Sequence, residues 1–158
     1  LCAEKKYILF SSSFVRFVKN YSLARKSLEN INDNSIELLE LKGYTRDEVS
    51  LLMNACDAAL LTSLREGSPQ FVKEAIACNC PIVSTDVGDV REVIGDTRGC
   101  YITTFEPEEV AEKIKMALDF SEKEGRTQGR KRIIDLGLDS DSAAKKIIRV
   151  YEQVLNQG

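Results

Sequence analysis

The chain has 158 residues, which suits one domain with a single core, and 43% hydrophobic with 30% charged residues is typical of a globular protein. With 22 Lys plus Arg against 25 Asp plus Glu, the net charge of −3 gives no basic footprint for nucleic acid. The chain contains no histidine, which excludes Ser/His and Cys/His catalysis. No apolar run approaches the ~20 residues that a membrane-spanning helix needs.

Cysteine usage bears on the redox compartment. The chain has five cysteines, an odd number, and three of them fall in apolar contexts. They are Cys2, Cys56, Cys78, Cys80 and Cys100. We expect reduced core thiols in a cytoplasmic protein. For the full-length protein, peripheral contact with the inner face of the membrane is the alternative location. The pair Cys78 and Cys80 has too few partners for a zinc site.

The first elements are a strand, a polar turn and a helix. An apolar run at residues 7–10 predicts the strand, and serines at positions 11–13 end it. Three apolar residues at helical spacing predict the helix that follows: Ala24, Leu28 and Ile31. Two cations, Arg16 and Lys19, lie between the strand and this helix, where they are either surface charges or ligand contacts.

A second strand and helix come next. Residues 35–41 combine alternation with apolar content, which predicts a strand, and Gly43 then marks a turn. Thr45 and Glu48 have the spacing of a capping box for a helix over residues 46–55.

The central stretch is expected to be strand, polar loop, helix and strand. Residues 58–62 are a short buried strand, and residues 81–85 are another. Between them, Ser68 is expected to cap a helix whose first position is Pro69. The helix start beside Gly67 would offer free N–H groups to an anion or a sugar. Spacing alone favours a capped helix whose two glutamates, Glu66 and Glu74, are merely solvated.

The remaining elements continue the alternation. Asp89 and Glu92 have capping-box spacing for a short helix, and a strand is expected at residues 99–103. Three helices should follow: an amphipathic one from Pro107, a basic one at residues 125–136, and a last one that starts at residues 139–141. The basic cluster is expected to be a solvated face.

This order predicts an α/β fold with a mainly parallel sheet of about five to six strands, covered by helices on both faces. Ligands bind such sheets at the carboxyl ends of the strands. The loops at residues 11–19, 42–44 and 64–69 all follow strands, so we expect them to share one edge and form a ligand site.

A family resemblance changes how the two glutamates are interpreted. The segment EGSPQFVKEA, preceded by LLTSLR and followed by PIVSTDVG, resembles the E-x7-E motif of group 1 retaining glycosyltransferases with the GT-B fold. It is most similar to their C-terminal, donor-binding domain, over about residues 7–155. The resemblance implies a Rossmann-like three-layer sandwich, with residues 1–158 as one nucleotide-sugar-binding domain and the N-terminal acceptor domain absent.

The resemblance also implies roles for single residues. Glu74 would bind the ribose, Glu66 the donor sugar near its reacting carbon, and Lys19 the diphosphate. Backbone amides within one donor-binding segment would hold the sugar hydroxyls and phosphate: Gly67, Ser68, Pro69 and Gln70. The leaving group would be stabilised by Lys19 and the helix start, with no cofactor and no metal expected.

Two serines depart from the family pattern, and two further residues have two interpretations each. Ser12 and Ser13 replace the usual Gly-Arg pair after the first strand. Arg16 either supplies that cation from a shifted position or is a surface charge. Tyr44 either stacks on the nucleotide base or packs as a half-buried aromatic, and packing is the favoured interpretation.

The expected function is retaining transfer of a hexosyl group to a glycan, lipid or other acceptor, in cell-surface polysaccharide biosynthesis. The partners would be the nucleotide sugar, the acceptor and the N-terminal domain of the same protein, and the isolated domain would be inactive. The alternative is a non-catalytic nucleotide-sugar-binding module. A receiver-like or flavodoxin-like domain and a dinucleotide-binding domain fit poorly, because the first loop has neither an acidic pair nor GxGxxG.

Overall fold

The computed structural model describes residues 4–156 and contains one five-stranded sheet. The strands are β1 (Lys6–Phe10), β2 (Ile36–Glu40), β3 (Ala58–Leu61), β4 (Ile82–Thr85) and β5 (Cys100–Thr103). Their spatial order is β2-β1-β3-β4-β5, and every neighbouring pair is parallel. The predicted parallel sheet is therefore confirmed, with five strands.

Helices follow the strands in the predicted order. A 3-10 turn, η1 (Phe17–Lys19), precedes the first of them. The α-helices are α1 (Tyr21–Ile31), α2 (Arg46–Ala55), α3 (Gln70–Ala77), α4 (Val90–Ile94), α5 (Pro107–Glu124), α6 (Gly129–Asp135) and α7 (Ser140–Leu155). Helix α2 begins with the predicted capping box, in which Thr45 and Glu48 bond to each other's backbone N–H.

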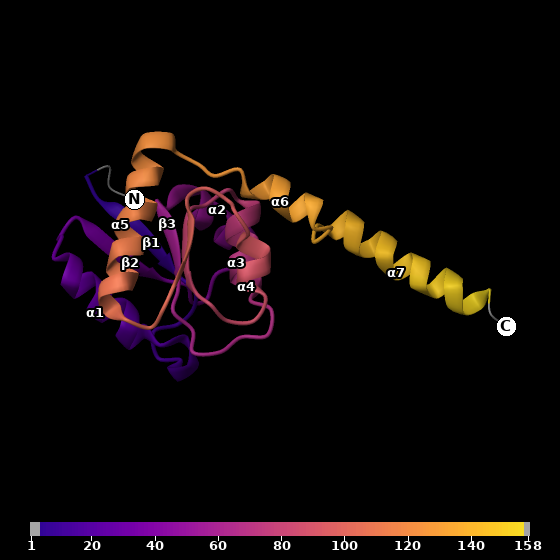
Figure 1. Cartoon of the computed structure of the whole chain (residues 1–158), viewed down its shortest axis with the longest axis horizontal. Helices are drawn as coiled ribbons and strands as arrows, with labels where there is room; N and C mark the ends of the chain where they lie inside the picture. Colours follow the sequence, from indigo (N-terminus) through magenta and orange to yellow (C-terminus); the bar gives the residue numbers. More distant parts are fainter. Residues whose placement is uncertain (1–3, 157–158) are drawn as a thin grey trace.

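Two hydrophobic clusters, one on each face of the sheet, form the core. Ile8, Phe10 and Leu60 pack on one face against α1 and α5 (Figure 1). Leu9, Leu61 and neighbouring residues pack on the other face with α2, α3, α4 and α6. The strands are buried on both sides, which explains their continuous apolar sequences. This is the Rossmann-like three-layer sandwich that the sequence predicted.

Two predicted caps and one helix boundary are wrong. Pro69 is the N-cap of α3 rather than its first residue, and Ser68 does not cap the helix. Asp89 is the N-cap of α4, but its side chain makes no capping hydrogen bond. The basic helix α6 begins at Gly129, because residues 125–128 form a loop with bends between α5 and α6.

The last helix extends away from the body of the molecule (Figure 1). Its apolar residues recur at the predicted spacing, yet none of the residues in α7 is buried. Ile147, Tyr151 and Leu155 are 58%, 68% and 78% exposed. Among the described residues, no helix combines the length and apolar character that crossing a bilayer requires.

Three of the cysteines are buried free thiols: Cys56, Cys80 and Cys100. Burial raises the pKa of Cys56 to about 11 and the pKa values of the other two to about 12. Cys78 is a partly exposed free thiol, whereas Cys2 lies outside the described residues. The prediction of reduced core thiols is confirmed for the three buried residues.

Strand order also places the ligand-binding edge. Strands β1 and β3 are neighbours in the sheet. From β1 the chain adds β2 on one side, and it then adds β3, β4 and β5 in turn on the other side, so the strand order reverses between β1 and β3. Doubly wound sheets with the order 2-1-3-4-5 bind ligands at this switch point, beyond the carboxyl ends of the strands. Flavodoxin-like domains share the order, so topology alone does not decide between that class and a glycosyltransferase.

Candidate functional site

The loops that follow β1 and β3 are fastened together at the switch point. The backbone N–H of Leu64 donates to the carbonyl oxygen of Val18 at 2.9 Å. The buried hydroxyl of Thr62 donates to the carbonyl oxygens of Lys19 at 2.9 Å and Asn20 at 3.1 Å. Asn20 adopts a left-handed conformation (φ 50°) at the joint between η1 and α1, which Asn tolerates better than most residues. These bonds fix the position of Lys19.

Lys19 and Glu66 form an ion pair between these two loops. The Nζ–Oε1 distance is 2.6 Å, and the side chains are only 11% and 19% exposed. Burial by itself raises the pKa of Glu66, but the hydrogen bond and charge of Lys19, with the charge of Arg16, lower it below its usual value. The carboxylate is therefore ionised and held beside an ammonium group.

The start of α3 lies next to this pair. Gly67 and Ser68 are exposed, and a Cβ built on Gly67 would meet no atom within 4 Å. No side chain of the described residues makes a capping hydrogen bond at this helix start. The positive end of the helix dipole and its free N–H groups therefore face open space, which is favourable for an anion.

Ser68 takes part in a cluster with two residues that sequence analysis did not assign to the site. Its hydroxyl donates to Oδ2 of Asp89 at 2.5 Å and accepts a short hydrogen bond from Lys73. Lys73 also pairs with Asp89 at 3.1 Å. The sequence spacing of Asp89 and Glu92 predicted a capping box within one helix. Such a local pattern carries no information on a contact with Ser68, which lies 21 residues away in the sequence.

Glu74 has different surroundings. Within residues 4–156 its carboxylate has no hydrogen-bond or ion-pair partner, and it lines a cavity of about 750 Å³ bounded by α2, α3, α6 and the start of α7. Burial raises the pKa of Glu74, and the charge of Arg46 only partly offsets this. The structure thus places Glu66, in the loop before α3, and Glu74, within α3, in separate environments.

The loop after β1 is also tied to β2. Oε1 of Glu40 accepts hydrogen bonds from the Ser13 hydroxyl and the Phe14 N–H, both at 2.8 Å. These bonds, that of the Phe14 N–H first, lower the pKa of Glu40. Ser13 therefore has a structural partner, which the sequence did not predict. Arg16 is exposed, and its charge reaches Glu66.

Tyr44 lies in the loop after β2 and is 48% exposed. Tyr44 is thus an exposed aromatic with part of its ring accessible, and neither hydrophobic cluster of the described residues includes it. The backbone at Gly43 has φ 78°, a conformation that glycine adopts without strain.

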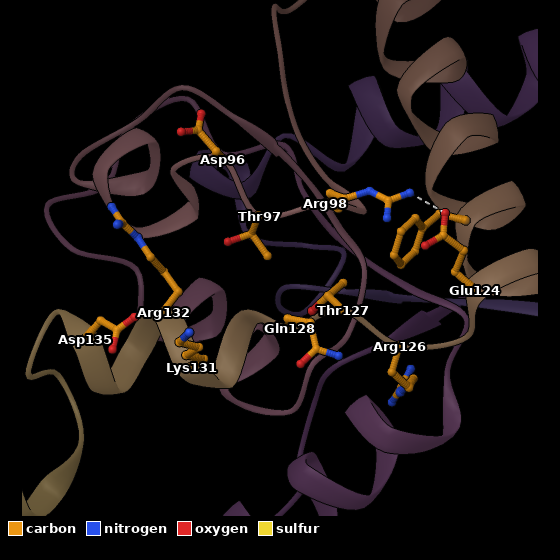
Figure 2. A pocket seen from close by; sticks show the side chains of 11 residues that line it. Asp96, Thr97, Arg98, Glu124, Arg126, Thr127, Gln128, Lys131, Arg132 and Asp135 are labelled. Atoms are coloured by element: carbon orange, nitrogen blue, oxygen red, sulfur yellow. Dashed lines mark hydrogen bonds and ion pairs between the residues drawn. The ribbon is translucent and has the colours of Figure 1, made fainter.

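A second cavity, of about 570 Å³, lies near the amino end of β5 and is lined by several cations (Figure 2). Arg98 pairs with Glu124 at 2.5 Å, as the dashed line in Figure 2 shows. Arg126 donates to the carbonyl oxygens of Met53 and Cys56 at the end of α2, and Arg132 donates to that of Glu92. Because these cations hold helix ends together, their clustering has a structural explanation.

The sequence profile of the family described as "Glycosyl transferases group 1" matches residues 6–119. The chain belongs to this family. The match decides against a flavodoxin-like protein, and it agrees with the resemblance carried by the segment around Glu66 and Glu74. It covers the sheet, the Lys19–Glu66 pair and most of α5.

Two curated relatives are glycosyltransferases by name. An N,N'-diacetylbacillosaminyl-diphospho-undecaprenol alpha-1,3-N-acetylgalactosaminyltransferase of Campylobacter jejuni is 32% identical over 131 residues, which cover 82% of this chain and 34% of the relative. An MMP alpha-(1->4)-mannosyltransferase of Mycolicibacterium hassiacum is 27% identical over 117 residues, covering 72% and 28%. The chain thus spans about a third of the length of these relatives.

Solved structures of glycosyltransferases share the fold of this chain. A glycosyltransferase of Rickettsia africae superposes with a TM-score of 0.81 at 14% identity, over 99% of this chain and 50% of that one. The Anabaena protein HepE, solved in complex with UDP and glucose, gives a TM-score of 0.70 at 16% identity, over 96% and 49%. These structures are about twice as long as the part that matches.

Proposed function

We propose that this chain is the C-terminal, donor-binding domain of a GT-B glycosyltransferase. It binds a nucleotide-diphosphate sugar for retaining transfer of a hexosyl group to a glycan, lipid or other acceptor. The observation that carries the proposal is the Lys19–Glu66 ion pair of 2.6 Å, which lies at the switch point of the sheet beside the open start of α3. A cation, an anion and free helix N–H groups are the set that a diphosphate joined to a sugar requires.

Lys19 is the proposed diphosphate ligand. An ammonium group has three N–H donors, and the ion pair with Glu66 uses one of them. Two donors remain for phosphate oxygens. As the bond to the sugar breaks, negative charge grows on the distal phosphate, and Lys19 together with the start of α3 stabilises it.

Glu66 is the proposed ligand of the donor sugar. Lys19 holds one oxygen of its carboxylate, so the second oxygen can accept a hydrogen bond from a sugar hydroxyl near the reacting carbon. The low pKa of Glu66 keeps the group ionised, which strengthens this bond. The backbone N–H groups of Gly67, Ser68 and Gln70 hold the remaining hydroxyls and the phosphate, whereas Pro69 has no N–H to donate.

Glu74 is the proposed ligand of the ribose. It is the fifth residue of α3, about 6 Å beyond the first residue, Gln70, at ~1.5 Å per residue. Its carboxylate has no protein partner among the described residues and borders a cavity, so both oxygens can accept hydrogen bonds from ribose hydroxyls. The nucleotide then extends along the helix from Glu74 toward Lys19.

Two further observations support the proposal. The solved relative HepE is titled as a complex with UDP and glucose, and the chain matches about a third to a half of its relatives. An N-terminal acceptor-binding domain of the same protein would complete the cleft and would provide a surface for the exposed apolar residues of α7.

Calorimetric titration with UDP, GDP and ADP tests the proposal. We expect the chain to bind at least one nucleoside diphosphate, because the Lys19 and Glu74 subsites are both within it. Glu74→Ala should weaken that binding about tenfold, the value of one good hydrogen-bonding pair to a charged group. Glu152→Ala is the matched control, since it removes an exposed helical glutamate on α7, away from the site.

A folded chain that binds no member of the panel would overturn the proposal. Equal binding by the wild type and Glu74→Ala would remove the ribose role of Glu74 alone. A measurement of sugar transfer by a longer form of the protein, which includes an acceptor domain, then distinguishes an enzyme from a non-catalytic module. If the protein is an enzyme, Glu66→Gln should abolish transfer.

A further inference from the structure

The loop between β4 and α4 packs directly on the loop that begins α3. Gly88 has φ 59°, and a Cβ at this position would overlap the carbonyl oxygen of Gly67. The two backbones are therefore in contact at a point where only glycine fits. Any ligand held by the amides around Gly67 depends on this second loop, although the loop itself is not in the proposed set of donor ligands.

Side chains reinforce the same contact. Asp89 accepts a hydrogen bond from the Ser68 hydroxyl at 2.5 Å and pairs with Lys73 at 3.1 Å, while Lys73 also donates to Ser68. The side chains of Lys73 and Asp89 are 18% and 30% exposed, so solvent screens the pair less than a fully exposed one. Three segments meet in one cluster: the loop before α3, its second turn and the loop before α4.

The position of Lys73 indicates that it serves this cluster rather than its own helix. It is the fourth residue of α3, near the positive end of the helix dipole, where a cation is locally unfavourable. Asp89 offsets that charge from another element. The pair is neutral as a whole, so the helix start keeps its attraction for an anion while its geometry is fixed from two sides.

We propose that Lys73 and Asp89 are positioning residues, which hold Ser68 and thereby aim the backbone N–H groups of Gly67, Ser68 and Gln70 at the distal phosphate of the donor. This inference rests on the proposed function, because the distal phosphate is the group assigned to those amides. It goes further by assigning the geometry of the phosphate subsite to two residues outside the proposed set of donor ligands, of which Lys73 also borders the cavity beside Glu74. The ribose is assigned to Glu74 instead.

The test compares a nucleoside diphosphate with the matching monophosphate, using the diphosphate that binds best. Wild-type protein should prefer the diphosphate. Lys73→Met should lower affinity for the diphosphate about tenfold and change affinity for the monophosphate by less than about twofold. Lys73→Arg, which keeps the charge and the hydrogen bonds, should retain the preference. Asp89→Asn should cause the same loss of diphosphate affinity. The double variant should lose no more affinity than Lys73→Met alone, because both substitutions break the same Lys73–Asp89–Ser68 cluster.

Arg91→Met is the matched control, since it removes the Arg91–Asp86 ion pair of 2.7 Å from the same loop without touching Ser68. It should leave the diphosphate preference unchanged. If Lys73→Met weakens both nucleotides equally, or neither, while the wild type shows the preference, the positioning role is overturned and the proposed function stands. If the folded wild type binds neither nucleotide, both proposals fall. Thermal unfolding of each variant shows that it is folded at the titration temperature.

Discussion

The two glutamates of the EGSPQFVKEA segment lie in opposite kinds of environment. Glu66 is mostly buried and paired with Lys19 at 2.6 Å, and its pKa is lowered. Glu74 has no partner among the described residues, faces a cavity, and has a raised pKa. The difference shows that one end of the site is already organised by the protein, whereas the other is open and can be satisfied by a ligand.

The largest expected effect comes from breaking the organised end. Lys19→Met leaves the carboxylate of Glu66 mostly buried without its partner, which should lower the free energy of unfolding by about 2 kcal/mol. Chemical denaturation measures this change, and titration should show that nucleoside diphosphate binding is lost. Lys26→Met, on the exposed side of α1, is the control and should change neither.

Adding Glu66→Gln to Lys19→Met should recover part of the lost stability, because it removes the unpaired charge. A Lys19→Met variant as stable as the wild type would show that the pair contributes nothing to the organised end.

The second prediction uses pH to contrast the two ends. The folded pKa of Glu66 lies below its ordinary value of 4.5, so its contribution to stability is present above pH 4.5 and is lost as pH falls through the folded pKa. The folded pKa of Glu74 lies above 4.5, so its protonation adds stability as pH falls through that value, and the gain is complete below 4.5.

Unfolding free energies of Glu66→Gln and Glu74→Gln should therefore diverge from wild type with opposite slopes between about pH 6 and pH 3. Denaturant titrations at several pH values measure these slopes. Parallel slopes would contradict the assignment of different environments.

A smaller effect should appear at Cys78, which lines the cavity beside Glu74. This thiol is partly exposed, whereas Cys56, Cys80 and Cys100 are buried with raised pKa values. Iodoacetamide should therefore modify Cys78 fastest among these four, and a bound nucleotide should slow that reaction about twofold by occupying part of the cavity. Peptide mass spectrometry follows each site separately. Unchanged labelling under saturating nucleotide would place the ligand away from this cavity.

The smallest change is expected on metal removal. Because Lys19 and the start of α3 are the proposed ligands of the diphosphate, nucleotide affinity should be the same with EDTA as with magnesium. Titration in the two buffers measures this. A marked loss in EDTA would mean that a divalent cation bridges the phosphates, and the role of Lys19 would need revision.

Much of the fold could be predicted because local patterns and burial agree. Thr45 and Glu48 gave the start of α2, and continuous apolar runs gave strands that are buried on both faces. Of the candidate site, the loops after the strands could be predicted to share an edge, since residues after parallel strands do so. The roles expected for Glu66 and Glu74 came from the family resemblance instead. The Lys19–Glu66 ion pair itself required the structure, because it depends on β1 and β3 being neighbours.

Helices α5 and α7 show the limit of pattern reasoning. Both have apolar residues at helical spacing, and in α5 Val110, Ile114 and Ala117 are buried against the sheet. In α7 the same spacing leaves Ile147 and Tyr151 exposed. Amphipathicity predicts that a helix has a face to bury, but it does not say which surface covers that face.

By itself, the sequence determined the alternation of strands and helices, the parallel sheet and the family resemblance around Glu66 and Glu74. These follow from periodicity, caps and short motifs, which act within a few residues of the chain. Tertiary structure alone decided that Ser68 binds Asp89 and Lys73 rather than capping α3, and that Glu40 holds Ser13. Such contacts join residues that only the packing of separate elements brings together, so no local pattern can specify them.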